Sequence, residues 1–190
     1  MTDYSKLVSI STITPFNVGL HSATEADMIS ALGRPQMPLT TKCQNDRASD
    51  AVGKLQTTAS VGPFRMTGIQ PAVASLKTIF MQLKTDKPDL YSVLRSAGML
   101  CVRLRKPTSG IPSTKISNHA WGTAVDLNIQ GHDPAGDTGT EVPLGIAILV
   151  PYFNRAGWYS GISFHDDMHF EVASETIHKW QVDGSLKSEA

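Results

Sequence analysis

The sequence predicts an α+β fold, with helices packed against a small, mostly antiparallel sheet. Apolar residues recur at helical spacing between residues 71 and 84, whereas segments 122–129 and 168–172 alternate as strands do. The order of the helical and extended segments along the chain is typical of this fold class.

Residues 1–66 are rich in Ser, Thr, Gly and Pro and predict turns, short strands and one short helix near "TEADMISALG". We expect residues 1–60 to form an N-terminal arm that packs on the fold or serves as a delivery or docking segment. Residues 61–190 would then form the functional domain.

The second part of the chain predicts alternating helices and strands. Helices are expected at 71–84, 86–98, 144–156 and 174–181, the second of them ending at Gly98. Strands are expected at "MLCVRLRK" (99–106), "GTAVDLNI" (122–129) and "MHFEV" (168–172). In the first of these strands Cys101, Arg103 and Arg105 would share one face.

Composition excludes some classes of partner. Among 190 residues, Lys plus Arg and Asp plus Glu both total 17, so the formal net charge is zero. This balance predicts no nucleic-acid partner. No apolar run approaches the length of about 20 residues that spans a bilayer, and the first residues, "MTDYSKLVSIST", lack the basic and apolar regions of an export signal. We therefore expect no membrane insertion and no conventional export.

The two cysteines, Cys43 and Cys101, do not have the spacing of zinc ligands. They could pair as a disulfide or remain free thiols, and the sequence leaves both alternatives open.

Asp126 is the first sign of a functional site. Alternation along 122–129 places it beside Gly122 and Ala124 on one face of a strand that is otherwise apolar. Burying a carboxylate without a partner is costly, so a bound cation is the simplest explanation. His119, seven residues earlier, is a natural second ligand.

A second cluster, "HDDMHFEV" (165–172), contains His169 and Glu171 on the same face of a strand as Asp167. Two histidines and one carboxylate that leave the fourth position open are the ligand set of a catalytic zinc site. Such a zinc ion activates a water molecule and polarises a carbonyl, and a nearby carboxylate must then take the proton of the water. Asp166 precedes this strand and could bend back towards the ligands.

The two clusters together resemble the signatures of the peptidase M15 family of D-alanyl-D-alanine carboxypeptidases and L-alanyl-D-glutamate endopeptidases. "SNHAWGTAVD" (117–126) resembles S-x-H-x-x-G-x-A-x-D, and "DDMHFE" (166–171) resembles D-x-x-H-x-E. The dipeptide "GW" at 157–158 is also similar to the family pattern. The resemblance covers about residues 60–180 and is specific over 99–126 and 157–172.

The resemblance implies that His119, Asp126 and His169 bind one zinc ion per chain. It implies that Asp166, three residues before the last ligand, is the catalytic base, and the neighbouring Asp167 is its rival.

The resemblance also implies residues around the metal. An arginine of the preceding strand would hold the substrate or stabilise the oxyanion; Arg103 is the first candidate and Arg105 the second, although the family's usual turn after this strand is absent. Arg105 or Lys106 could bind a terminal carboxylate. Ser117 would lie beside the substrate, Glu171 would orient a histidine ligand, and Trp158 would contact the substrate or the ligands.

The implied function is hydrolysis of peptidoglycan stem peptides or cross-links by a zinc peptidase. Carboxypeptidase and endopeptidase activities remain open, and the loop 130–143 would border the groove that decides between them. Without an export signal, the protein would be made in the cytoplasm and reach the periplasm or cell wall as a phage endolysin or as an antibacterial effector, the latter with an immunity protein as partner. The alternative is a non-catalytic zinc module of the same fold that binds rather than cleaves.

Overall fold

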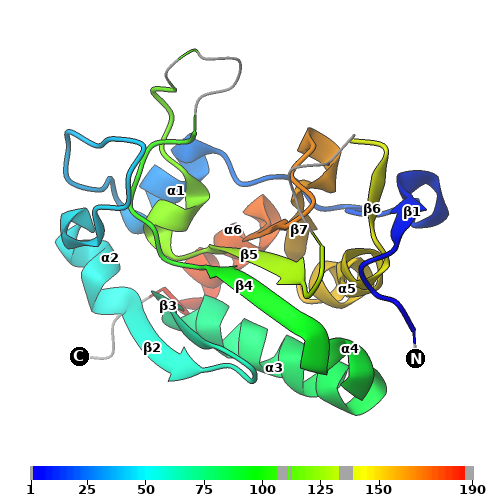
Figure 1. Cartoon of the computed structure of the whole chain (residues 1–190). Coiled ribbons are helices and arrows are strands. Elements are labelled where there is room, and N and C mark those ends of the chain that lie inside the picture. Colours follow the sequence, from blue (N-terminus) through cyan, green and yellow to red (C-terminus); the bar gives the residue numbers. More distant parts are fainter. Residues whose placement is uncertain (1, 107–110, 112, 133–138, 187–190) are drawn as a thin grey trace.

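The computed structural model describes residues 2–106, 111, 113–132 and 139–186. Its centre is a four-stranded antiparallel sheet in the order β4-β5-β8-β7 (Figure 1). These strands are β4 (Leu94–Gly98), β5 (Ala124–Ile129), β8 (His169–Val172) and β7 (Trp158–Ser160). The predicted α+β class is thus confirmed.

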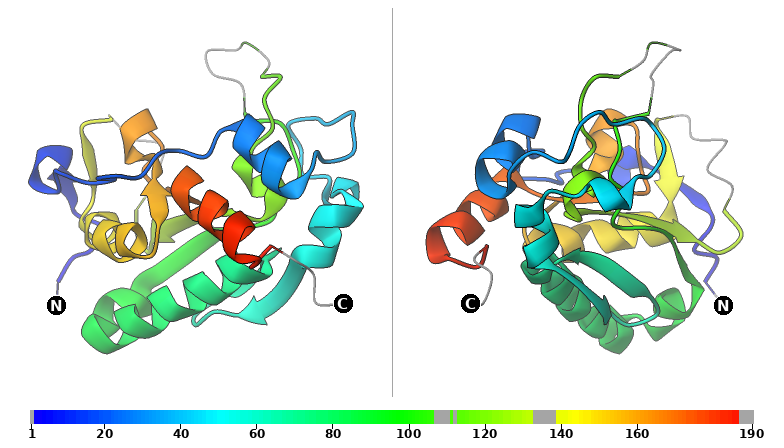
Figure 2. Two further views of the ribbon diagram at one scale, coloured as in Figure 1. Left: turned by 180° about the vertical axis from the view of Figure 1, so that it is seen from behind. Right: turned by 90° about the vertical axis from the view of Figure 1, so that its left-hand side faces the viewer.

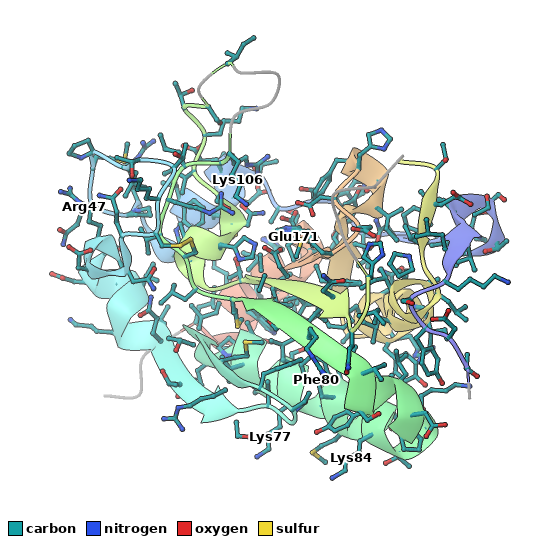
Figure 3. All side chains as sticks on the ribbon, in the orientation of Figure 1. Arg47, Lys77, Phe80, Lys84, Lys106 and Glu171 are labelled. Atoms are coloured by element: carbon teal, nitrogen blue, oxygen red, sulfur yellow. A yellow bond between two sulfur atoms is a disulfide. The ribbon has the colours of Figure 1, made fainter. Side chains whose placement is uncertain are left out.

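Two helices, α3 (Gln70–Asp86) and α5 (Leu144–Arg155), enclose the main core with the sheet. Phe80 of α3 packs on Phe153 of α5 with ring centroids 6.3 Å apart, and Phe153 packs on Phe170 of β8 at 4.2 Å. In Figure 3, Phe80 lies below β5, towards α3, and Glu171 lies above this strand. Alternation along β8 therefore turns Phe170 towards the aromatic core and Glu171 towards the opposite face.

Smaller elements surround this core. A hairpin is formed by β2 (Gln56–Ser60) and β3 (Arg65–Ile69), and β1 (Leu7–Ser9) pairs with β6 (Glu141–Pro143). The remaining helices of the described residues are α1 (Glu25–Leu32), α2 (Asp50–Leu55), α4 (Pro88–Val93), α6 (Ser174–Asp183) and the 3₁₀ turns η1 (Ile10–Thr12), η2 (Asn45–Arg47), η3 (Asn118–Trp121) and η5 (Gly161–Phe164). None of the helices in the described part of the chain is both long and apolar enough to cross a bilayer.

The N-terminal segment crosses the back of the molecule from β1 to α1, which lies beside α6 (Figure 2). Asn17 is fixed on the way, because its backbone amide donates to Asn154 of α5 and its side-chain amide donates to the carbonyl of Ser160. The predicted boundary between residues 60 and 61 falls inside the β2–β3 hairpin. The division into an arm and a domain remains a prediction.

The helix predicted over 86–98 is too long. Helix α4 ends at Val93, and the next five residues form β4, which pairs with β5. Leu94 is buried as its apolar pattern indicates, but in a strand. Gly98 ends no helix; it lies opposite Asp126 after a register shift, because the unpaired edge of β5 takes β4 as its partner.

The strand predicted over 99–106 is wrong. The backbone of this segment bonds to several separate segments instead of one neighbouring strand: the amide of Cys101 donates to His119, and that of Leu104 donates to Thr40. Cys101 is also joined to Cys43 in a disulfide, with their Cα atoms 4.9 Å apart. The segment is therefore an irregular extended chain held between two loops.

Gly122 connects η3 to β5 and is expected to tolerate no side chain. Its φ is +65°, and a Cβ atom would lie 2.5 Å from the Cα of Gly68. We expect Gly122→Ala to lower the free energy of unfolding by about 2–4 kcal/mol, since a left-handed conformation alone costs about 1–2 kcal/mol. Urea denaturation measures this change.

The matched control is Gly53→Ala in α2, where a Cβ atom meets nothing within 4 Å. Alanine favours a helix over glycine, so this variant should be as stable as the wild type or more stable. Equal stability of the two variants would contradict the importance of the Gly122 turn.

Candidate metal centre

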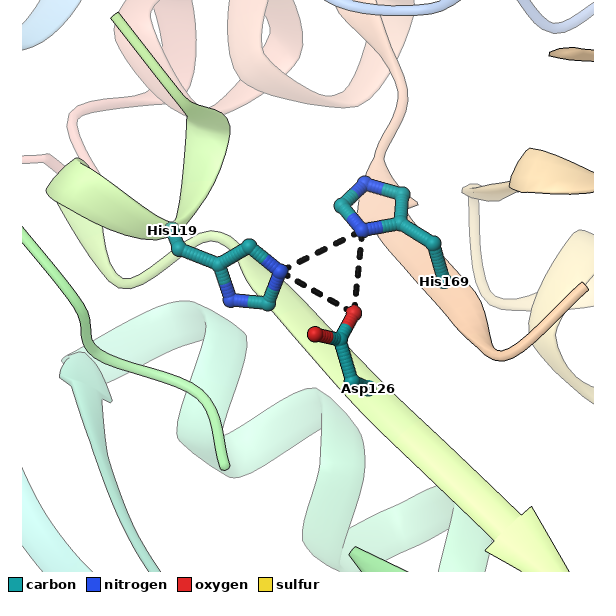
Figure 4. Close-up of side chains that lie close together, drawn as sticks. All are labelled: His119, Asp126 and His169. Atoms are coloured by element: carbon teal, nitrogen blue, oxygen red, sulfur yellow. Dashed lines mark hydrogen bonds and ion pairs between the residues drawn. The ribbon is translucent and has the colours of Figure 1, made fainter. Parts of the chain in front are cut away.

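Three side chains converge on the face of the sheet opposite the aromatic core (Figure 4). Asp126 and His169 are direct cross-strand partners in the β5–β8 register, and His119 approaches them from η3. The Nε2 atom of His119 lies 3.0 Å from Oδ1 of Asp126 and 3.2 Å from Nδ1 of His169. Nδ1 of His169 lies 3.1 Å from the same carboxylate oxygen. The structure thus brings together the three predicted metal-binding residues.

The other ring nitrogen of each histidine has a partner that fixes its tautomer. Nδ1 of His119 donates to the carbonyl of Met99 at 2.7 Å, and Nε2 of His169 donates to the carboxylate of Glu171 at 2.9 Å. A carbonyl oxygen can only accept, so the proton of His119 resides on Nδ1. With a metal bound, Nε2 of His119 and Nδ1 of His169 would therefore offer it their lone pairs.

The donor geometry suits zinc. Ligand atoms at about 2.0–2.1 Å from a tetrahedral zinc ion are about 3.3–3.4 Å apart. The three donor–donor distances, 3.0–3.2 Å, are only slightly shorter. Two imidazoles and one carboxylate also leave a fourth position for water or substrate.

The electrostatics of this group also favour a cation. Burial alone would raise the pKa of Asp126, but the hydrogen bonds with His119 and His169 outweigh it and hold the pKa well below its usual range. Burial alone would lower the pKa of His169, yet Asp126 and Glu171 together raise it to about 10. The carboxylates of Asp126 and Glu171 thus create a negative potential at His169, and this potential also favours a divalent cation.

Asp166 and Asp167 differ sharply in their surroundings. Asp167 is buried, with 6% of its surface exposed, whereas Asp166 is exposed to solvent. The backbone of Asp166 forms a tight turn into β8, since its carbonyl accepts from the amide of His169. The protein still removes enough water from Asp166 to raise the pKa of its carboxyl, against the opposite effect of the nearby His169. Of the two aspartates, Asp166 is the one that solvent and a substrate can reach.

The predicted cations lie in the irregular segment before η3. The guanidinium of Arg103 donates to the carbonyl of Leu104, and that of Arg105 donates to the carbonyl of Ile116. Lys106 is close enough to Asp166 for its charge to lower the pKa of that carboxyl. The role of Arg103 remains a prediction. Lys106 is the one of these three cations whose charge affects the pKa of Asp166, the predicted base.

Two other predicted residues are buried. Ser117 immediately precedes η3, and its backbone amide donates to the carbonyl of Arg103. Trp158 is 0% exposed, and its indole nitrogen donates to Ser75 of α3. The side chain thus packs in the aromatic core against Phe153, and its predicted role near the substrate or the ligands stays a prediction. The role of Ser117 beside the substrate remains a prediction.

Three neighbours of the site were not predicted. The hydroxyl of Ser22 and the amide of Asn118 both donate to Glu171, and Phe164 lies beside His169 with ring centroids 5.7 Å apart. Asn118 immediately precedes His119 within the motif "SNHAWGTAVD", so its place in this motif could have marked it as a neighbour of the site. Ser22 offered none, because 149 residues separate it from its partner.

A domain of α+β class that holds two histidines and one carboxylate in this geometry has the site of a metal-dependent hydrolase. In comparison with known families, a model described as D-alanyl-D-alanine carboxypeptidase matches residues 112–172. This segment contains all three converging residues as well as Asp166, and its match supports the resemblance of this part of the chain to the M15 peptidase family. Comparisons with curated proteins and with solved structures gave no match.

Proposed function

We propose that the protein is a zinc peptidase that hydrolyses peptide bonds in peptidoglycan stem peptides or cross-links. The observation that carries the proposal is the convergence of His119, Asp126 and His169 within reach of one ion, next to the solvent-exposed Asp166. A non-catalytic zinc module would need the three ligands but would have no use for a carboxylate at the rim.

Zinc bound at this site would lower the pKa of a water molecule to about 7 and polarise the scissile carbonyl. The chain supplies the proton transfers. Asp166 would accept the proton of the attacking water and then donate it to the departing amine. A raised pKa suits both tasks, because a proton carrier works best when its pKa lies near the working pH.

A cation is also needed for the negative charge that develops on the carbonyl oxygen. Arg103 is the candidate from the family resemblance, and Lys106 is the candidate from its electrostatic effect on Asp166. A carboxypeptidase also needs a cation for the free terminal carboxylate of its substrate. Arg105 could bind it, as could the one of Arg103 and Lys106 that does not stabilise the oxyanion.

The matching family description, D-alanyl-D-alanine carboxypeptidase, supports a substrate that contains D-residues. Such peptides occur in the bacterial cell wall, so the protein would act in the periplasm or on the wall after phage lysis or non-classical secretion. The disulfide between Cys43 and Cys101 agrees with an oxidising site of action. If the protein is a secreted effector, an immunity protein is expected as its partner.

Phe164 is predicted to form an apolar wall of the substrate site. Its side chain is 45% exposed although it lies against His169, and Tyr159 stacks behind it with an interplanar angle of 14°. We expect Phe164→Ala to raise KM about two- to tenfold, with a smaller change in kcat, since an aromatic contact contributes about 0.5–1.5 kcal/mol. Steady-state kinetics on a stem peptide measure this change.

Met81→Ala is the matched control, because Met81 is an exposed apolar residue on α3. An unchanged KM for Phe164→Ala, or an equal change for both variants, would show that Phe164 does not touch the substrate.

Defined peptides test the proposed function and identify the bond. The zinc-loaded protein is incubated with a stem pentapeptide that ends in D-Ala-D-Ala, with the same peptide as its C-terminal amide, and with an all-L version. Mass spectrometry of the products identifies the bond that is cleaved. Release of D-Ala from the free acid alone indicates a carboxypeptidase, whereas internal cleavage of both D-containing peptides indicates an endopeptidase. The prediction that the loop 130–143 borders the substrate groove falls largely on residues 133–138, which lie outside the described part of the chain. Zinc binding without cleavage of any peptide would contradict the proposal.

A further inference from the structure

Glu171 holds the histidine ligand of β8, and it is itself held by three donors. It is 3% exposed and lies on the site face of the sheet. One carboxylate oxygen accepts from the hydroxyl of Ser22 at 2.5 Å. The other accepts from the amide of Asn118 at 2.7 Å and from Nε2 of His169 at 2.9 Å. A buried carboxylate needs such donors, because each unsatisfied oxygen would carry a desolvation cost.

The geometry of these bonds assigns the outer nitrogen of His169 to Glu171. Nε2 of His169 donates to the carboxylate, so Nδ1 is the ring nitrogen that faces the shared centre and would bind a metal.

Two of the contacts around Glu171 come from the N-terminal segment. Ser22 donates to Glu171, and the carbonyl of the next residue, Ala23, accepts the second proton of the Asn118 side-chain amide at 3.0 Å. Ala23 is 1% exposed, so this stretch is inserted into the fold. Residues 22 and 23 thus bond to Glu171 and to Asn118, the side chain that donates to the same carboxylate.

The segment is fixed on both sides of Ser22. On one side, the carbonyl of His21 accepts from the amide of Ser174, and the amide of His21 donates to Glu175. On the other side, the hydroxyl of Ser174 donates to Asp27, the capping residue in the first turn of α1. Ser22 is therefore held in place by the two bonds of its neighbour His21, which involve neither Glu171 nor the Ser174 hydroxyl.

We propose that the N-terminal segment completes the metal centre, with Ser22 as a positioning residue that acts through Glu171 on His169. The inference rests on the proposed function in that it assumes a metal at the three converging side chains. It assigns the arm a task beyond delivery or docking, namely to fix the tautomer and orientation of one ligand through Glu171, which lies 149 residues beyond Ser22 in the sequence.

Zinc affinity of the full-length protein, measured by competition with a chromogenic chelator, tests the inference without any substrate. Groups that orient ligands typically contribute about 10- to 100-fold to metal affinity. We expect Glu171→Gln to raise the Kd for zinc within this range and Ser22→Ala to raise it about tenfold. Ser22→Thr keeps the hydroxyl and should restore the affinity to within about twofold of the wild type.

Ser174→Ala is the matched control, because it removes a hydroxyl that secures the same segment without touching Glu171. It should leave the Kd for zinc unchanged, and the melting temperatures of the metal-free Ser22→Ala and Ser174→Ala variants should fall by similar amounts. A double variant, Ser22→Ala with Glu171→Gln, should bind zinc no more weakly than Glu171→Gln alone, because Ser22 acts through Glu171.

Three results would overturn the inference: an unchanged Kd for Ser22→Ala, equal losses for Ser22→Ala and Ser174→Ala, or additive losses in the double variant. A wild-type protein that binds zinc and shows these expected affinities, yet cleaves no stem peptide, would leave the inference in place and contradict the proposed function alone.

Discussion

Replacing Asp166 by asparagine is expected to lower kcat/KM by about 10²–10⁴-fold while zinc content stays at the wild-type level. Asparagine keeps the size of the side chain but cannot accept and return a proton, and general acid–base catalysis contributes about this factor. Asp166 is exposed and contacts the sheet through its backbone, so the fold should be retained. Kinetics on the best stem peptide and metal analysis of the same samples measure both quantities.

Asp89→Asn, an exposed aspartate of α4, is the control and should retain full activity. If Asp166→Asn keeps more than about a tenth of the wild-type kcat/KM, another group carries the proton. Asp167 would then be the next candidate, although it is buried.

The Asp126→Ala variant is expected to lose most of its zinc affinity. Structural zinc sites bind with about 10–16 kcal/mol in total, so one of about four ligands accounts for about 3–4 kcal/mol. Each 1.4 kcal/mol is a factor of ten, and the Kd should therefore rise by about 10²–10³-fold. Asp126 contributes the oxygen that lies within 3.1 Å of both histidine donors, and within the described residues it is the only carboxylate of this group.

Asn128→Ala tests whether this loss is specific to the ligand. Asn128 lies on the same strand two residues further on, and its side-chain oxygen bonds to the amide of Ile129. Its replacement should leave zinc affinity unchanged. A Kd within tenfold of the wild type for Asp126→Ala would remove this residue from the ligand set.

The parts of the site that could be predicted from sequence are those encoded within a few residues of one another. Alternation placed Asp126 on the open face of a strand, and it placed His169 and Glu171 together on another strand. The structure pairs these strands so that Asp126 and His169 are opposite each other. Local patterns also predicted α3 and α5 well, because their apolar residues recur over three or more turns.

The errors arose where distant parts of the chain decide local structure. Residues 94–98 carry a helical pattern but form β4, because pairing along β5 satisfies backbone groups of both strands. Residues 99–106 alternate like a strand, yet their backbone bonds are shared between the loops around Thr40 and His119. The contact of Ser22 with Glu171 belongs to the same class, since nothing near Ser22 in the sequence marks it.

The most direct test of the proposed function is the digestion of purified peptidoglycan sacculi by four samples of the full-length protein. These are the wild type as purified, the chelator-treated wild type, the same sample after addition of one equivalent of zinc, and zinc-loaded Asp166→Asn. We predict muropeptide cleavage by the first and third samples only, with about one zinc ion bound per chain. Binding of one zinc ion with every muropeptide unchanged would contradict a cell-wall peptidase, and equal cleavage by all four samples would contradict both the metal and Asp166 as parts of the mechanism.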